Sequence, residues 1–147
     1  DTDNLCVSNC GPDHWGETTS RKCLIDPFQC PDGYYADNAT NMCVQSVDCS
    51  IVNGVQYVAD NSTKQCLSGC PPQSIIINWA DLTKNLCVAK CPFNKFGDNN
   101  TLTCIDECKT GGIYNGEYAD PQLRICVVVC SAYPIPTYGE NDTYTCV

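Results

Sequence analysis

The stretch Cys30–Val44, which reads CPDGYYADNATNMCV, sets the pattern of the whole chain. Its two cysteines enclose twelve residues, and an acid stands six positions before the second cysteine, after one large and one small residue. An aliphatic residue follows the second cysteine. Gly, Pro, Asn and Asp interrupt the stretch, and no helical period is present, so it predicts a short β-finger closed by turns.

The same pattern recurs along the chain and makes seven repeats. They span residues 10–23, 30–43, 49–66, 70–87, 91–104, 108–126 and 130–146, and three to six residues link one repeat to the next. The acid is present in every repeat, as Glu17, Asp37, Asp60, Asp81, Asp98, Asp120 and Glu140. A unit of about 20 residues cannot bury a hydrophobic face alone, so it needs a disulfide and its neighbours. We therefore expect one tandem array over residues 1–147, a β- and turn-dominated rod with almost no helix.

Composition agrees with a disulfide scaffold. The chain has 147 residues and 15 cysteines, and cysteine above about 8–10% marks disulfide-rich proteins of oxidising compartments. The expected location is extracellular or at the cell surface. The net charge of −9 comes without a basic cluster, which excludes nucleic acid as a partner. No apolar run approaches the roughly 18 residues of a membrane span, so no insertion is expected within this segment.

Geometry favours pairing within repeats over pairing across the links. Cysteines four apart in an extended link lie about 13 Å apart, beyond the Cα separation of about 4.4–6.8 Å in a disulfide. Crossed patterns between neighbouring repeats stay open. The predicted pairs are Cys10–Cys23, Cys30–Cys43, Cys49–Cys66, Cys70–Cys87, Cys91–Cys104, Cys108–Cys126 and Cys130–Cys146.

Cys6 is left over, and Cys6–Cys10 copies the link Cys66–Cys70. We interpret Cys6 as the tail of a preceding repeat and the chain as a segment of a longer array. The competing interpretation pairs Cys6 with a cysteine of another subunit, which would make covalent polymers.

Four sequons share one register, five residues before the second cysteine. Their asparagines are Asn38, Asn61, Asn99 and Asn141. Chance sequons would scatter, so we predict an N-linked glycan at each of these turns. The alternative is that Asp-Asn-x-Thr is simply a favourable turn sequence, because Asn and Asp cap turns through their side chains.

The acids themselves suit turns better than metal sites. An Asp after a small residue commonly accepts backbone N–H bonds in a tight turn, whereas a calcium site needs several oxygens within one short loop. CxxxC links and a single His do not match the spacings of zinc sites. We expect no cofactor and no metal, although calcium at the turn acids stays open.

Catalysis is not expected. His14 is the sole candidate imidazole base, and a cysteine held in a disulfide is not a nucleophile. A narrow rod also offers no cleft for paired carboxylates.

The large residue of each repeat is expected to pack as a wedge between neighbours. Ile75, Ile76 and Ile77, with Trp79 nearby, interrupt the polar loop of the fourth repeat and form a possible interface for self-association.

Residues 30–44 resemble the single-disulfide modules of furin-like and growth-factor-receptor cysteine-rich regions. They look still more like the tandem cysteine-rich repeats of protist, particularly ciliate, surface proteins. Furin-like regions contain denser CxxC pairs that this chain lacks. The resemblance implies an extracellular, disulfide-bonded spacer and no catalytic residues.

Two functions fit these observations. The first is a glycosylated structural repeat protein that builds a filament, surface coat or appendage by self-association. The second is a receptor or adhesin ectodomain stalk that binds a protein or glycan through its irregular third, fourth and sixth repeats.

Overall fold

The computed structural model describes residues 10–72, 77–108, 118–128, 130, 139–140 and 145–146. Over these residues the chain consists of short strands and turns, with two single-turn 3-10 helices, η2 (Pro27–Gln29) and η3 (Ser46–Asp48). The small, disulfide-rich, β-dominated fold with repeated modules is confirmed. No helix in the described part of the chain has the length and apolar character of a membrane span.

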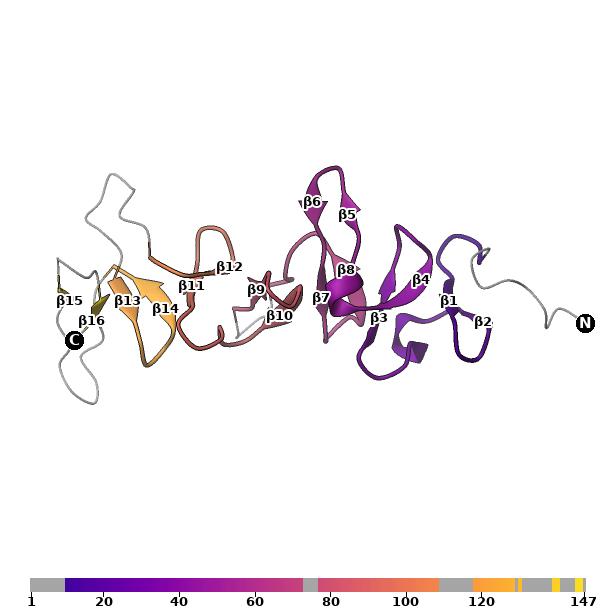
Figure 1. Cartoon of the computed structure of the whole chain (residues 1–147), viewed down its shortest axis with the longest axis horizontal. Helices are drawn as coiled ribbons and strands as arrows, with labels where there is room; N and C mark the ends of the chain where they lie inside the picture. Colours follow the sequence, from indigo (N-terminus) through magenta and orange to yellow (C-terminus); the bar gives the residue numbers. More distant parts are fainter. Residues whose placement is uncertain are drawn as a thin grey trace, which may run out of the picture. The chain divides into compact units, whose positions relative to one another are not determined.

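Each repeat contributes one antiparallel hairpin (Figure 1). In the first six repeats the large, small and acidic residues form the first strand, and the second cysteine with its two neighbours lies in the second strand. The hairpins are β1 (Trp15–Glu17) with β2 (Lys22–Leu24), β3 (Tyr34–Asp37) with β4 (Met42–Gln45), β7 (Val58–Asp60) with β8 (Gln65–Leu67), β9 (Trp79–Asp81) with β10 (Leu86–Val88), β11 (Phe96–Asp98) with β12 (Thr103–Ile105), β13 (Tyr118–Asp120) with β14 (Ile125–Val127), and β15 (Gly139–Glu140) with β16 (Thr145–Cys146).

The third repeat carries an extra hairpin, β5 (Ile51–Val52) and β6 (Val55–Gln56). It forms a two-stranded sheet of its own and stands apart from β7 and β8 in Figure 1.

Seven disulfides close the repeats, each with Cα atoms 5.6–5.7 Å apart. They join the pairs favoured by the spacing argument: Cys10–Cys23, Cys30–Cys43, Cys49–Cys66, Cys70–Cys87, Cys91–Cys104, Cys108–Cys126 and Cys130–Cys146. Cys6 lies outside the described residues.

The chain divides into two compact halves, residues 1–71 with 82–87 and residues 72–81 with 88–147. In the first half the strand order is β10-β7-β8-β3-β4-β1-β2, and in the second it is β15-β16-β13-β14-β11-β12-β9. Strands pair antiparallel within a repeat and parallel between neighbouring repeats. The hairpins of successive repeats are therefore joined into one sheet within each half.

One backbone bond marks each junction between described repeats. The small residue of one repeat donates its N–H to a carbonyl in the turn of the next, at 2.7–2.9 Å. The bonds are Gly16 N to Asn41 O, Ala36 N to Lys64 O, Ala59 N to Asn85 O, Ala80 N to Leu102 O, and Gly97 N to Arg124 O.

The accepting residue always lies four positions after the acid and has a positive φ. These angles, 47–58°, belong to the acceptors Asn41, Lys64, Asn85, Leu102 and Arg124, and Arg21 at the same position of the first repeat has a φ of 55°. A four-residue loop that ends in the left-handed region is a common hairpin connection. The last residue of the turn therefore directs its carbonyl toward the neighbouring repeat, where it accepts the hydrogen bond.

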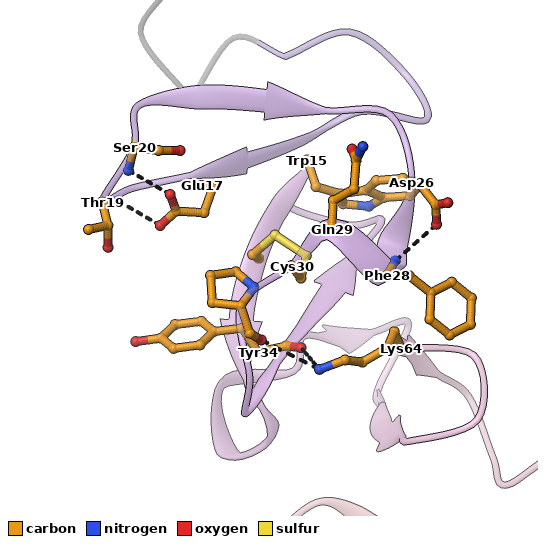
Figure 2. The surroundings of a disulfide bond; sticks show 12 residues. Trp15, Glu17, Thr19, Ser20, Asp26, Phe28, Gln29, Cys30, Tyr34 and Lys64 are labelled. Carbon is orange, nitrogen blue, oxygen red and sulfur yellow. Dashed lines mark hydrogen bonds between the residues drawn. A yellow bond between two sulfur atoms is a disulfide. The ribbon is translucent and has the colours of Figure 1, made fainter.

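The core consists of the disulfides and the large residues that pack against them. Trp15 packs with Cys30 and Cys43 of the next repeat, and Figure 2 shows its indole beside this disulfide. Tyr35 packs in the same way against Cys49 and Cys66. In the second half, Trp79 packs against Cys91 and Cys104, and Phe96 packs against the cluster of Cys108 and Cys126. The expectation that the large residue is a wedge between repeats is confirmed at these junctions.

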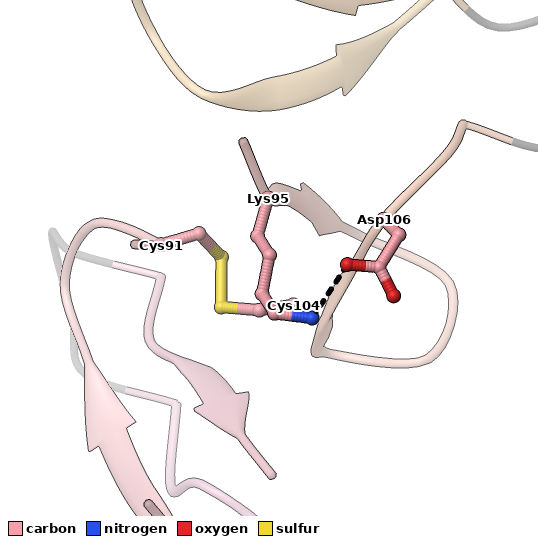
Figure 3. A network of polar contacts seen from close by, with 4 residues as sticks. All are labelled: Cys91, Lys95, Cys104 and Asp106. Atoms are coloured by element: carbon pink, nitrogen blue, oxygen red, sulfur yellow. Dashed lines mark hydrogen bonds and ion pairs between the residues drawn. A yellow bond between two sulfur atoms is a disulfide. The ribbon is translucent and has the colours of Figure 1, made fainter. Parts of the chain in front are cut away.

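Ion pairs add little to this core. Lys95 Nζ lies 2.7 Å from Asp106 Oδ1, close to the Cys91–Cys104 disulfide in Figure 3. The Asp106 side chain is 81% exposed, and pairs of this kind contribute about 0–1 kcal/mol. This ion pair is therefore a minor contribution beside the disulfides and the large residues that pack on them.

Gly97 is required by the wedge above it. A Cβ at this position would overlap the indole ring of Trp79, which is enclosed by the fifth repeat. We expect Gly97→Ala to lower the free energy of unfolding by about 2 kcal/mol, the usual cost of overpacking. Thermal denaturation of the oxidised protein measures it. Gly69→Ala is the control, because nothing lies within 4 Å of a Cβ there, and an equal loss in both variants would contradict the packing argument.

Candidate functional site

The six turn acids whose side chains are described are buried, and five of them accept hydrogen bonds within their own turns. Asp37, Asp60, Asp81 and Asp120 are at most 2% exposed, and Glu17 and Asp98 are at most 9% exposed. Asp60 accepts bonds from Thr63 N and Thr63 Oγ1, both at 2.9 Å, and Asp98 accepts from Thr101 Oγ1 at 2.7 Å. The side chain of Glu140 lies outside the described residues.

Asp37 also reaches the next repeat. It accepts hydrogen bonds from Thr40 Oγ1 at 2.8 Å and from Ser50 Oγ, in the third repeat, at 2.5 Å. Glu17, Asp37, Asp60, Asp98 and Asp120 thus each accept hydrogen bonds within their own turns. Within the described ranges, no group of three or more His, Cys, Asp or Glu side chains is placed to hold a metal ion.

Glu17 shows the electrostatic consequence of this bonding (Figure 2). Ser20 N donates to its carboxylate at 2.5 Å and Thr19 N at 2.7 Å. The hydrogen bonds from the Ser20 side chain and backbone, followed by that from Thr19, lower the pKa of Glu17 from 4.5 to about 2.

This lowered pKa predicts an acid-dependent stability. Because the pKa of Glu17 is lower in the folded state, its contribution is complete above about pH 4.5 and is lost as pH falls toward 2. We expect the thermal midpoint to fall over this window, and Glu17→Gln to lower the midpoint near neutral pH and to reduce the fall. The exposed Glu107→Gln is the control. An unchanged pH profile in Glu17→Gln would contradict the assignment.

The sequon asparagines Asn38, Asn61 and Asn99 are exposed at the first position of the turn. Trp15 Nε1 donates to Asn38 Oδ1 at 2.9 Å, and Tyr35 OH donates to Asn61 Oδ1 at 2.6 Å. Burial, and after it the charge of Asp60, raises the pKa of the Tyr35 phenol, which keeps the hydroxyl protonated as a donor. Asn141 lies outside the described residues.

The possible interface of the fourth repeat is only partly described. Ile75 and Ile76 lie outside the described residues, and Ile77 is 49% exposed. Trp79 is only 8% exposed because it packs against the disulfide of the fifth repeat, so its ring is not available to a partner.

The third repeat holds the feature that the sequence analysis missed. Asn53 and Gly54 have φ of 51° and 79° and join β5 to β6, as in a type I′ turn. An Asn-Gly pair between β-branched residues is a strong hairpin signal. The sequence analysis compared only the positions that all repeats share, so it did not predict this hairpin.

The β5–β6 hairpin is apolar on both faces and held firmly at its base. Ile51 is 68% exposed and Val55 is 48% exposed. They occupy opposite faces, because Ile51 pairs with Gln56 and Val52 pairs with Val55. Gln56 Nε2 donates to Cys49 O at 2.8 Å, and Tyr57 N donates to Ser50 O at 3.0 Å. The hairpin is therefore preorganised beside the Cys49–Cys66 disulfide.

The outer edges of this hairpin have no strand partner among the described residues. An exposed edge with apolar side chains can bind an added strand, which supplies main-chain bonds and side-chain contacts together. Nearby, η3 exposes Val47, and a shallow groove lined by Tyr34, Met42 and Asp48 lies over β4. The third repeat is thus the best candidate binding surface of the described part.

Comparison with known proteins gives one informative match. A putative insulin-like peptide receptor of Hydra vulgaris is 27% identical over 125 residues, which covers 73% of this chain and 8% of the relative. No protein-family model matches the chain, and no solved structure matches it. A receptor-type relative agrees with the resemblance to growth-factor-receptor cysteine-rich regions. The comparison does not support the resemblance to ciliate proteins.

Proposed function

We propose that this chain is a segment of the extracellular part of a receptor-type protein, and that its third repeat binds a polypeptide partner. The receptor-named relative and the seven disulfides support an extracellular setting. The chain spans only 8% of that relative, so the activity of a whole receptor is part of the proposal.

The exposed β5–β6 hairpin carries this proposal. Single exposed apolar residues are ordinary on protein surfaces, whereas an unpaired strand edge with an exposed apolar side chain on each face is suited to binding an added strand. Ile51 and Val55 lie on such an element. The occupant that matches both the free edges and the β-branched side chains is an extended segment of another polypeptide.

The role proposed here is binding and not catalysis. The described cysteines are held in disulfides, and His14 Nδ1 lies 2.9 Å from Pro12 O in an exposed turn.

Binding of an insulin-like peptide, the ligand class in the relative's name, tests the proposal. We expect saturable fluorescence anisotropy when the labelled peptide is titrated with the secreted, oxidised chain. Ile51→Asp with Val55→Asp should weaken binding at least about tenfold, since each buried apolar side chain contributes about 1.5–3 kcal/mol. Ile25→Asp is the control, because Ile25 is 70% exposed on the first repeat.

Self-association remains the second candidate, supported by the exposed Ile77. Sedimentation velocity separates the two. A mass that grows with concentration and falls to the monomer in Ile77→Asp, together with no peptide binding, would favour a filament or coat and overturn the receptor proposal.

A further inference from the structure

Two junctions in the first half are joined by a side-chain hydrogen bond as well as by the backbone. The large residue of one repeat donates to the sequon asparagine of the next, from Trp15 to Asn38 and from Tyr35 to Asn61. These bonds are 2.9 and 2.6 Å long and span 23 and 26 residues of sequence. We call this contact the aromatic–asparagine joint.

The sequence repeats the pairing at every junction. Where the large residue can donate a hydrogen bond, the next repeat has Asn after its acid, and where it cannot, the next repeat has another residue. The donor pairs are Trp15 with Asn38, Tyr35 with Asn61, Trp79 with Asn99, and Tyr118 with Asn141, and the apolar pairs are Val58 with Leu82 and Phe96 with Pro121. Asn therefore follows the acid wherever the large residue of the preceding repeat carries a hydrogen-bond donor, and a donor buried at a junction needs such an acceptor.

The joint uses only one end of the asparagine amide. Oδ1 accepts the aromatic donor, while Asn38 and Asn61 are exposed and their Nδ2 atoms make no hydrogen bond within the described residues. Nδ2 is the atom that carries an N-linked sugar, and the linkage leaves Oδ1 intact as an acceptor.

The threonine two residues later is not explained by the joint. Thr40 and Thr63 donate to the turn acids, but the turn of Asp120 forms with backbone N–H groups of Gln122 and Leu123 and no hydroxyl at that position. Even so, Thr accompanies Asn in all four repeats that contain Asn. A glycosylation sequon requires both residues together.

We propose that Asn38 and Asn61 each have two roles: Oδ1 joins consecutive repeats, and Nδ2 carries an N-linked glycan at the same junction. The sugar donor is an oligosaccharide activated as a polyprenyl diphosphate. Nδ2 loses a proton and forms a bond to the anomeric carbon, the bond from that carbon to the phosphate oxygen breaks, and the polyprenyl diphosphate leaves.

The fourth and fifth repeats supply a matched control. Asn99 has the same sequon and is exposed, but Trp79 Nε1 has no hydrogen-bond partner among the described residues, because its indole lies over Gly97. Asn99 should therefore carry a glycan without acting as a joint in this conformation.

Glycopeptide mass spectrometry tests the first role. The chain is secreted from a glycosylating eukaryotic host, and the glycans are released in heavy-oxygen water by an amidase that converts the glycosylated Asn to Asp. We expect the oxygen label at Asn38, Asn61 and Asn99. Unlabelled Asn38 and Asn61 in the secreted chain would overturn the proposal.

Hydrogen exchange tests the joint separately. The chain for this experiment is produced in its oxidised form by a host that does not attach glycans. The Ala36 amide bonds Lys64 O at the same junction as Asn61, and the Ala80 amide bonds Leu102 O at the junction of Asn99. Asn61→Leu should speed exchange of Ala36 about fivefold, the factor for one net hydrogen bond, while Asn99→Leu leaves Ala80 unchanged. Tyr35→Phe should reproduce the Asn61→Leu effect with the ring kept.

The two assays give results that can be told apart. If Asn38 and Asn61 carry glycans but the exchange rate of the Ala36 amide is unchanged in Asn61→Leu and in Tyr35→Phe, the sequons are ordinary surface sites. That result would overturn the dual role. Because neither assay involves a ligand, failure of peptide binding to the third repeat would leave this inference standing.

Discussion

Replacing both Cys30 and Cys43 by serine is expected to lower the free energy of unfolding of the first half by about 3 kcal/mol. Two losses combine. The unfolded chain is no longer restricted by the 13-residue separation of the two cysteines, and the surface on which Trp15 packs is gone. The first repeat should therefore loosen together with the second.

Hydrogen exchange read by mass spectrometry checks this result. Protection at Gly16 and Ala36, whose amides bond the turns of the second and third repeats, should fall sharply. The matched variant removes Cys91 and Cys104 in the second half and should expose Ala80 and Gly97 while Gly16 keeps its protection. Uniform loss over the whole chain in both variants would contradict a fold stabilised repeat by repeat.

Asp37→Ala is expected to have an effect of similar size, about 3 kcal/mol. Its carboxylate is completely buried and accepts bonds from Thr40 and Ser50, and hydrogen bonds to a charged group contribute about 1.5–3 kcal/mol. Removing it leaves donors of two repeats without their acceptor. Urea denaturation of the oxidised chain measures the loss.

Two further variants identify the cause. Ser50→Ala removes only the bond that Asp37 accepts from the third repeat and should have roughly a third to a half of the effect. Asp32→Ala, at an exposed position of the same repeat, should have almost none. If Asp32→Ala and Asp37→Ala lowered stability equally, net charge and not the buried carboxylate would be responsible.

Much of the fold could be predicted because its main constraints are local in sequence. The turn residues and the absence of a helical period predict short β-fingers, and the cysteine spacing favours pairing within a repeat, which is the pattern in the structure. The parallel contact between repeats was not predicted. It depends on a carbonyl at a positive-φ residue such as Lys64 or Leu102, and these residue types give little sign of that conformation.

The candidate site was harder to predict for a different reason. The repeat alignment directs attention to shared positions, whereas the β5–β6 hairpin lies between the first cysteine and the large residue, where length and sequence differ from repeat to repeat. For Trp79 the shared position was the better guide. Its neighbours Ile75–Ile77 suggested that it belongs to an interface, but it occupies the position of the large residue and lies in the core. Distances between repeats cannot be read from one sequence, so the donor role of Trp15 and Tyr35 toward asparagine also needed the structure.

The position of the added hairpin has a consequence for how such chains can diversify. The backbone bonds that join the repeats run from the small residue of one repeat to the turn of the next, and the segment between the first cysteine and the large residue takes no part in them. Side-chain bonds from Ser50 to Asp37 and from Lys64 to Pro31 O, by contrast, do involve this segment. In the third repeat this segment holds β5 and β6, while in the second it is only Pro31–Gly33 and the start of β3. Length and sequence can therefore change there at low cost, as they do in an antibody loop, while the framework keeps its register. Tandem duplication followed by variation of this one segment would give a lineage new recognition surfaces on an unchanged scaffold.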